Sequence, residues 1–203
     1  MSLPPRKLGT IRSALTPSSQ PLVSQAGSTV AGHQIGGDYR PTIYEARKSA
    51  GVVEQLLRKL HHEVENNIHA SETLSRLQRY HGGLVTDDVR GLTAKLERAG
   101  RSRELETALE RKEMFAKLLE HWSHYASAQE IFAYLLARAE HFFTTEILPS
   151  IDDLSEIEIN QRMNILIVNP TVEECGATVF QIDHLTAMGM VYWLAEQCFV
   201  RWH

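Results

Sequence analysis

Apolar residues recur at spacings of three and four along most of the chain, and this period constrains the fold more than any other feature of the sequence. The pattern begins near Ile43 and continues towards the C-terminus. Such a spacing places apolar side chains on one face of an α-helix. We therefore predict an all-α fold in which residues 43–203 form an irregular helical bundle. The clearest face, over residues 103–126, consists of Leu105, Ala108, Leu109, Phe115, Leu118, Leu119, Trp122 and Tyr125.

Glycine and capping residues mark the boundaries of the first predicted helices. Residues 43–80 form either one long helix or two helices that break near Asn66 and Asn67. The His-Gly-Gly sequence at 81–83 is expected to end this region, because glycine readily adopts the conformation that terminates a helix. Thr86 is the predicted N-cap of the next, short helix.

Three later helices are predicted from capping boxes, in which a Ser or Thr is followed three positions later by Glu. The pattern occurs at Ser127, Ser155 and Thr171. Pro149 and Pro170 are expected to end the first and second of these helices, because proline has no N–H group to donate and its ring clashes with the preceding turn.

The C-terminal stretch is predicted to be a helix up to about Gln197, with a short strand over residues 198–202 as an alternative continuation. Phe199 and Trp202 are large aromatic residues, which suit an exposed chain end poorly. We expect both to be buried, against the protein's own helices or against a partner, with Arg201 exposed between them.

The first 42 residues lack the helical period. Residues 1–27 are rich in Ser, Pro, Thr and Gln and are predicted to be a disordered tail, because little apolar surface is available to offset the entropy of ordering. Residues 28–42 resemble two short strands joined by a turn, and so small a strand pair is unstable alone. We expect this segment to pair with sister subunits or with another protein; a flexible linker is the alternative. Its central residues are Ile35, Gly36, Gly37, Asp38 and Tyr39.

The composition is typical of a soluble globular protein, and we expect a cytoplasmic location. The Ile-Leu-Ile-Val run at 165–168 is far shorter than the roughly 18 apolar residues of a membrane span. The first 20 residues have no apolar segment typical of a secretory signal. Cys175 and Cys198 are the two cysteines, and in the cytosol we expect both to be reduced.

Charge is unevenly distributed along the chain. Residues 1–100 contain 13 Lys and Arg against 9 Asp and Glu, whereas residues 101–203 contain 8 against 16. Nucleic-acid-binding domains are usually strongly basic, so direct binding of nucleic acid is predicted to be weak or absent. Arg98, Arg101 and Arg103 lie near a helix junction, where contact with phosphate is one interpretation and an ordinary exposed loop is the favoured one.

No pattern of catalytic residues is found. The sequence has no nucleophile elbow, phosphate-binding loop or dinucleotide fingerprint. Ten histidines raise a metal hypothesis, but neither the Glu-x-x-His spacing of bundle di-iron sites nor convergent Cys and His pairs are present. We therefore predict no enzymatic activity, no cofactor and no bound metal. The histidines considered are His61, His62, His69, His121 and His124.

Residues 92–203 carry four motifs in a fixed order. These are a leucine-rich helix with Phe115, a Ser-Ala-Gln-x-Ile helix start, an Ile-x-Pro-x-Ile helix stop and a closing Gly-Met-x-Tyr-x-Leu pattern with a final Cys-x-x-x-Trp. This order resembles the C-terminal domain of bacterial ABC-three component systems, anti-phage defence operons related to Lamassu. The motif positions are Phe115, Ser127, Ala128, Gln129, Pro149, Gly189, Tyr192, Cys198, Arg201 and Trp202.

The resemblance implies a non-catalytic assembly domain. In that family the domain links an effector, often a nuclease, to an SMC-like or ABC-type ATPase and a small middle component. Members without an effector often begin with Gly-Asp repeats similar to residues 30–39, although His33 stands here where Asp is expected. The implied role is an adaptor within a homo-oligomer that docks an effector or sister subunits to the ATPase. Two alternatives are a nucleic-acid-binding or metal-dependent protein that uses the histidines and arginines, and a helical scaffold unrelated to defence.

Overall fold

The structure is a computed structural model of the chain, and it describes residues 51–83 and 89–203. The chain divides into two units, Met1–Glu45 and Ala46–His203, and all the helices described below belong to the second. The predicted tail over residues 1–27, the pairing segment over residues 28–42 with Ile35 to Tyr39, and the predicted N-cap Thr86 lie outside the described residues.

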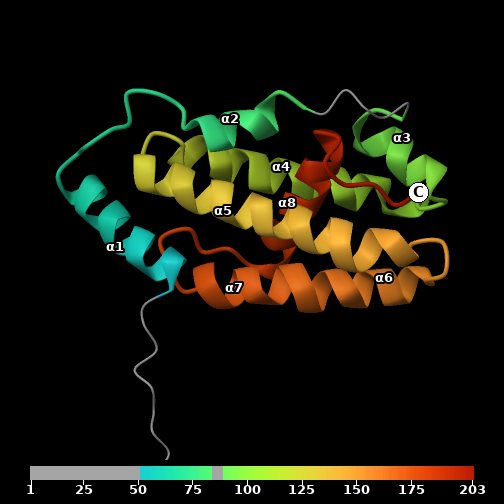
Figure 1. Cartoon of the computed structure of the whole chain (residues 1–203). Coiled ribbons are helices and arrows are strands. Elements are labelled where there is room, and N and C mark those ends of the chain that lie inside the picture. Colours follow the sequence, from blue (N-terminus) through green and yellow to red (C-terminus); the bar gives the residue numbers. More distant parts are fainter. Residues whose placement is uncertain (1–50, 84–88) are drawn as a thin grey trace, which may run out of the picture. The chain divides into compact units, whose positions relative to one another are not determined.

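The all-α prediction is confirmed, and the described residues contain no strand. Short 3-10 and π-helical turns join several of the helices. Figure 1 shows α5 lying alongside α6 and α7, which run antiparallel to it, with α1 at one end. The helices are α1 (Val52–Glu65), α2 (Ser75–His81), α3 (Gly91–Arg98), α4 (Leu105–Trp122), α5 (Ala126–Phe142), α6 (Glu156–Met163), α7 (Asn169–Cys175) and α8 (His184–Glu196).

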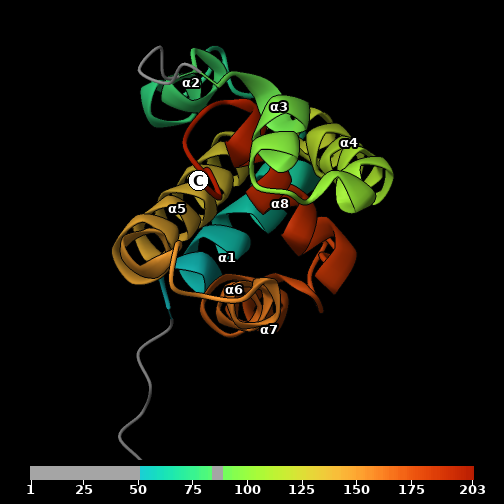
Figure 2. The ribbon, with the colours of Figure 1, turned by 90° about the vertical axis from the view of Figure 1, so that its right-hand side faces the viewer.

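Helix α8 is the centre of the fold. Every residue from Thr186 to Ala195 is buried, so the helix is apolar on all sides, as expected of an element surrounded by protein. Figure 2 shows α8 with α4 on one side, α5 on the other and the α6–α7 pair below it. The side chain of Asp183 caps its N-terminus by accepting a hydrogen bond from the backbone N–H of Thr186 at 2.8 Å.

The first helical region consists of two helices rather than one. Helix α1 ends at Glu65, and Asn67 adopts a left-handed conformation with φ of 54°. The connecting loop is fixed to the α4–α5 junction because Ala70 donates a backbone hydrogen bond to the carbonyl of His124 at 2.8 Å. Helix α2 ends at His81, as the two glycines that follow it predict, and Gly83 has φ of 63°.

The predicted helix break at Pro170 is wrong. Helices α6 and α7 form one continuous helical run, joined by a π-helical turn over Asn164–Val168. A π-helical turn shifts the hydrogen-bond register, and Pro170, which has no N–H, directly follows that shift. Thr171 is therefore no N-cap: its hydroxyl lies inside the helix and donates to the carbonyl of Ile167 at 2.7 Å.

Two other predicted helix boundaries are confirmed. The capping box at Ser155 is confirmed, since the Ser155 hydroxyl accepts from the Glu158 N–H and the Glu158 carboxylate accepts from the Ser155 N–H. Helix α5 ends near Pro149 as expected, after a π-helical turn over Phe143–Ile147 and a 3-10 turn over Leu148–Ser150. Pro149 lies exposed within that 3-10 turn.

The C-terminal segment is buried but is not a strand. Phe199, Val200 and Trp202 are all buried, whereas Arg201 is exposed, as the aromatic content predicts. Strict alternation fails because two successive residues are buried. The chain leaves α8 through Cys198, whose φ of 65° turns it back onto the protein's own helices.

Candidate interaction surface

Most of the predicted family-motif residues lie in the core around α8. Phe115 from α4 contacts the α8 residue Trp193, with ring centroids 5.9 Å apart. Tyr192, also on α8, packs against Trp202 at the same centroid distance. The Tyr192 hydroxyl lies 3.4 Å from the Glu104 carboxylate, and burial together with that negative charge raises the pKa of Tyr192. These positions hold the α4–α8 interface and the C-terminal segment together.

Gly189 permits the closest approach between α4 and α8. A Cβ atom at this position would lie 2.1 Å from the carbonyl oxygen of Arg111 and 3.3 Å from the Cβ of Phe115. Real side chains do not make contacts this short with backbone atoms. The glycine is therefore required by the packing of the two helices.

The predicted capping box at Ser127 is wrong. Helix α5 begins at Ala126 with Tyr125 as N-cap, and Ser127 lies inside the first turn. Its N–H and hydroxyl both donate to the carboxylate of Glu63 on α1, at 3.1 and 2.7 Å. A carboxylate is favourable at a helix N-terminus, where free N–H groups concentrate positive charge. Helix α1 thus supplies the cap for α5 from 64 positions away.

The other two motif residues of this turn are also structural. Ala128 is fully buried. The amide of Gln129 joins the loop before α2 to the start of α5: its oxygen accepts from the Leu74 N–H, and its nitrogen donates to the carbonyls of Glu72 and Ser123. A glutamine that satisfies three backbone groups fixes the position of α2 on the bundle.

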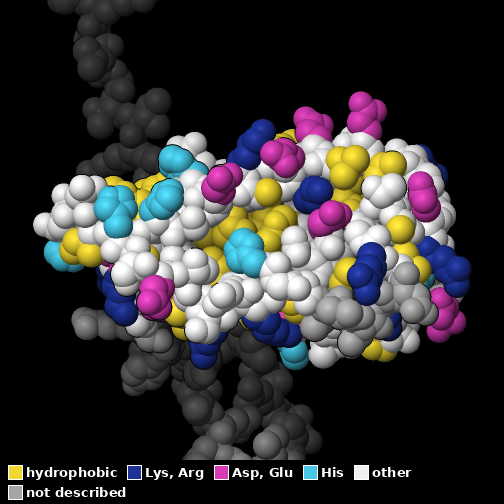
Figure 3. Space-filling model, turned by 90° about the horizontal axis from the view of Figure 1, so that it is seen from above, with side chains coloured by type: hydrophobic (Ala, Val, Ile, Leu, Met, Phe, Trp, Pro, Cys, Tyr) yellow, Lys and Arg dark blue, Asp and Glu magenta, His cyan; other side chains and the backbone are white. Residues whose placement is uncertain are grey.

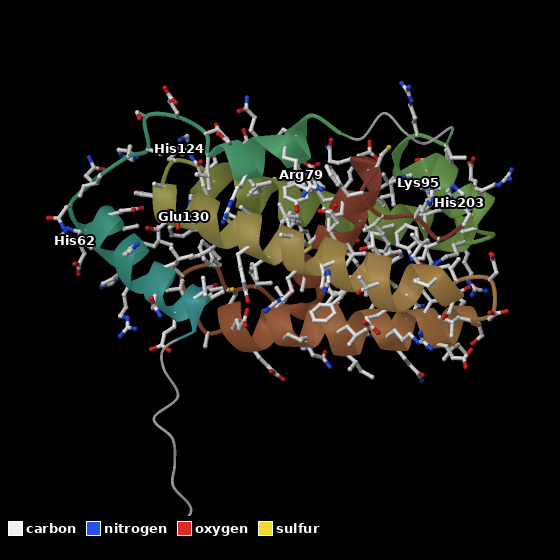
Figure 4. All side chains as sticks on the ribbon, in the orientation of Figure 1. His62, Arg79, Lys95, His124, Glu130 and His203 are labelled. Carbon is white, nitrogen blue, oxygen red and sulfur yellow. The ribbon has the colours of Figure 1, made fainter. Side chains whose placement is uncertain are left out.

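Lys95 is a buried cation that the sequence pattern did not single out. Its side chain is fully enclosed, and its ammonium donates to the carbonyls of Ala195 at 2.9 Å and Val200 at 3.0 Å. The carbonyls at a helix C-terminus carry partial negative charge, which favours a cation. Lys95 therefore joins α3 to the end of α8 and to the C-terminal segment. Figure 4 shows Lys95 and His203 at the same end of the bundle.

The arginine cluster is not simply an exposed loop. Arg101 is buried; it donates to Glu104 at 2.9 Å and Asn160 at 2.6 Å, and its guanidinium lies over the Trp202 ring at 5.4 Å. Arg103 pairs with Glu156 on α6 and is exposed. Arg98 is exposed. Two of the three arginines are therefore bound to acceptors of the protein itself.

The histidines lie at several places in the fold. His69 stacks on Tyr125 with centroids 5.2 Å apart, and the His124 ring lies 6.5 Å from His69. His62 lies at the end of α1, and its Nδ1 is 3.0 Å from the Asn66 amide nitrogen. Within residues 51–83 and 89–203, no group of three or more His, Cys, Asp or Glu is arranged to hold a metal ion.

Helix α2 separates two open grooves. The α1–α2–α5 groove has a volume of about 510 Å³, with Leu56, Tyr80 and Ala133 among its buried lining residues and Arg76 and Glu130 exposed on its rim. Figure 4 labels Arg79 and Glu130 on this side of the molecule. Arg79 and the Tyr80 hydroxyl both bind Glu140, at 2.7 and 2.8 Å. Burial and the Glu140 carboxylate raise the pKa of Tyr80, which keeps this tyrosine protonated.

The α2–α4–α8 groove, on the other side of α2, has a volume of about 520 Å³. Its lining includes Leu77 from α2, Ala116, Leu119 and Glu120 from α4, and Trp193 from α8. Figure 3 looks down on this face and shows hydrophobic side chains exposed at its centre, bordered by charged side chains and a histidine. Because both grooves are open and partly lined by apolar side chains, we regard both as candidate surfaces for binding protein.

A comparison with protein families identifies the class of the domain. Residues 91–202 match the model of C-terminal domain 9 of the ABC-three component (ABC-3C) systems. The match spans more than half of the chain, and the chain belongs to this family. Comparisons with curated proteins and with solved structures each return no match. Among the described residues, no helix is both long enough and apolar enough to span a membrane.

Proposed function

We propose that the chain is a non-catalytic adaptor of an ABC-three component system that acts against phage in the cytoplasm. In this role it docks an effector or sister subunits to an SMC-like or ABC-type ATPase, together with the small middle component of the same operon. The observation that supports this proposal most strongly is the family match over residues 91–202. Relationship to the Lamassu systems is part of the same proposal.

The arrangement of the motif residues supports a binding role over a chemical one. Phe115, Gly189, Tyr192 and Trp202 hold the bundle together, and apolar side chains line the two grooves beside α2. Burial raises the pKa of the Cys175 thiol to about 12, so this cysteine is a poor nucleophile near neutral pH. A rigid bundle with open apolar grooves suits the docking of other proteins.

We further propose that residues 28–42, around Ile35, Gly36, Gly37, Asp38 and Tyr39, mediate self-association. Deletion of this segment is expected to lower the oligomeric mass in light scattering while the helical circular dichroism stays unchanged. An unchanged mass would contradict this part of the proposal.

Affinity purification of the tagged chain, co-expressed with the neighbouring genes of its operon, tests the adaptor role. We expect the ATPase and the small component to be recovered with the chain, and the purified chain alone to hydrolyse neither ATP, DNA nor RNA. Failure of the ATPase to be recovered would contradict the adaptor role. The metal-dependent alternative predicts tight stoichiometric metal and a nuclease activity that His121→Ala removes.

A further inference from the structure

The floor of the α2–α4–α8 groove is apolar and already ordered. Leu77, Leu119 and Trp193 are all nearly enclosed, yet each borders the groove. The Trp193 indole is held at its edges by His81, with centroids 5.7 Å apart, and by Phe115 at 5.9 Å. A partner that binds here would not need to immobilise these side chains, which lowers the entropic cost of association.

The α4 wall of the groove has one carboxylate. Glu120 borders the groove, is exposed, and forms no ion pair with any described residue. Glu113, two turns earlier on α4, is paired with Lys117 at 3.5 Å. Among the described residues no Lys or Arg lines the groove, and His81 is the other ionisable side chain in its lining. The wall therefore offers an uncompensated carboxylate beside an apolar floor. By contrast, the rim of the α1–α2–α5 groove has charges of both signs, Arg76 and Glu130, and favours neither sign in a partner.

The shape of the wall suits a helix. Ala116, one turn before Glu120, presents only a methyl group between the floor and the outer face of α4. A small residue at this position lets another backbone approach closely. Helix-in-groove binding uses this combination: apolar anchors at helical spacing enter the groove, and polar residues line its edge.

We propose that the α2–α4–α8 groove binds an amphipathic helix of a partner protein. A leucine or phenylalanine of that helix packs on Leu119 and Trp193, and a lysine or arginine on its edge pairs with Glu120. The inference rests on the proposed adaptor function and specifies the chemistry of the partner segment.

The first test uses a designed peptide probe and the full chain. The probe is about 14 residues long, roughly 21 Å as a helix, with Leu at positions i, i+3, i+4 and i+7 and Lys along the edges; a second probe has Glu in place of every Lys. Binding is measured by the fluorescence anisotropy of the labelled probe. We expect the Lys probe to bind and the Glu probe not to bind. Absence of binding by the Lys probe, or equal binding of both probes, would overturn the proposal.

Three variants locate the binding site. Ala116→Trp fills the groove and is expected to weaken binding on the order of tenfold or more. Glu120→Gln preserves the shape and is expected to weaken binding roughly two- to fivefold, as for one exposed ion pair. Glu173→Gln, which removes an exposed carboxylate from α7, is the matched control and should leave binding unchanged. Equal losses in Glu120→Gln and Glu173→Gln would show attraction by overall charge only and would contradict the proposed site.

The same variants separate this inference from the adaptor role. If the ATPase is recovered with the wild-type chain and equally with Ala116→Trp, the adaptor role is supported and the groove proposal fails. Loss of the ATPase in Ala116→Trp, with helical circular dichroism intact, supports both.

Discussion

The Lys95 ammonium lies 2.9 Å from the carbonyl oxygen of Ala195, and this hydrogen bond joins α3 to the last turn of α8. The same ammonium binds the carbonyl of Val200, so one buried charge fixes the start of the matched domain, its central helix and the C-terminal segment. Helix α8 in turn supplies Trp193 to the floor of the proposed partner groove. The stability of the fold and the shape of the groove therefore depend on the same contacts.

Replacing Lys95 tests this relationship. Lys95→Met retains most of the side-chain volume but removes the donor of the Val200 carbonyl, whereas the Ala195 carbonyl still accepts from the Cys198 N–H at 3.1 Å. A buried unsatisfied carbonyl costs about 1–3 kcal/mol, so we expect the free energy of unfolding to fall by that amount. Urea denaturation followed by circular dichroism measures the change. Arg98→Met, on the exposed side of α3, is the control and should change stability by less than about 0.5 kcal/mol; equal effects of the two substitutions would contradict the role of Lys95.

Adding one methyl group at Gly189 tests the α4–α8 contact. In an ordinary helix interior, Gly→Ala is stabilising by about 0.5–1 kcal/mol. At this position the new Cβ would meet the Arg111 carbonyl at 2.1 Å, so the helices must move apart. We expect Gly189→Ala to destabilise by about 1–3 kcal/mol in thermal or urea unfolding. Gly82→Ala, where the nearest atom would lie at 3.8 Å, is the comparison variant, and a stabilising effect of Gly189→Ala would disprove the close contact.

The cap supplied by Glu63 to α5 is testable by a double-mutant cycle. Glu63→Ala and Ser127→Ala each remove one side of the contact, and each is expected to cost about 1 kcal/mol, as for other N-cap losses. Because both changes remove the same hydrogen bond, the double variant should lose less than the sum of the two. Glu65→Ala, on the exposed side of α1, provides the baseline. Additive losses would mean that the two residues do not interact.

Asp183 gives a prediction of pH dependence. Hydrogen bonds from the backbone of Thr186 hold the pKa of Asp183 below its usual value. A carboxyl group whose pKa is lower in the folded state stabilises the protein above its unfolded pKa, near 4, and loses that contribution as the pH falls through the folded pKa. The stability difference between wild type and Asp183→Ala should therefore be largest, about 1 kcal/mol, at pH 6–7 and should shrink below pH 4. Urea midpoints measured across this range check it; a difference that grows on acidification has the wrong sign.

Much of the helical bundle was predictable because its signals are local. The apolar period locates α4, α5 and α8, and the cap at Ser155 depends only on its own next three residues. The break between α1 and α2 follows from Asn67, which tolerates a left-handed conformation. Such features depend on residues close together in the sequence.

The errors arise where a distant element overrides a local signal. Ser127 has capping-box spacing, but Glu63 from another helix binds it and moves the start of α5. A proline such as Pro170 normally ends a helix. Here it follows a π-helical turn that shifts the hydrogen-bond register, and the helix continues through it. Leu109 fits the apolar period of α4 and yet is exposed on its outer face.

The candidate surface was less predictable than the fold. Most residues of the family motif pack the core, although Pro149 and Arg201 are exposed, so the motif identifies the domain without marking its binding face. Lys95 resembles a solvated cation in sequence, and Glu120 resembles any exposed glutamate on an amphipathic helix. The docking of α3 on the end of α8 makes Lys95 a core residue, and the packing of α2 and α8 against α4 makes Glu120 part of a groove wall.

The proposed adaptor role is tested most directly by sedimentation velocity of the purified chain mixed with the purified ATPase of the same operon. We predict a faster-sedimenting complex that contains both proteins, retained by a variant that lacks residues 1–27 and formed with or without ATP hydrolysis by the ATPase. The chain and the ATPase sedimenting as separate species, in the presence of the small middle component as well as in its absence, would contradict the adaptor role.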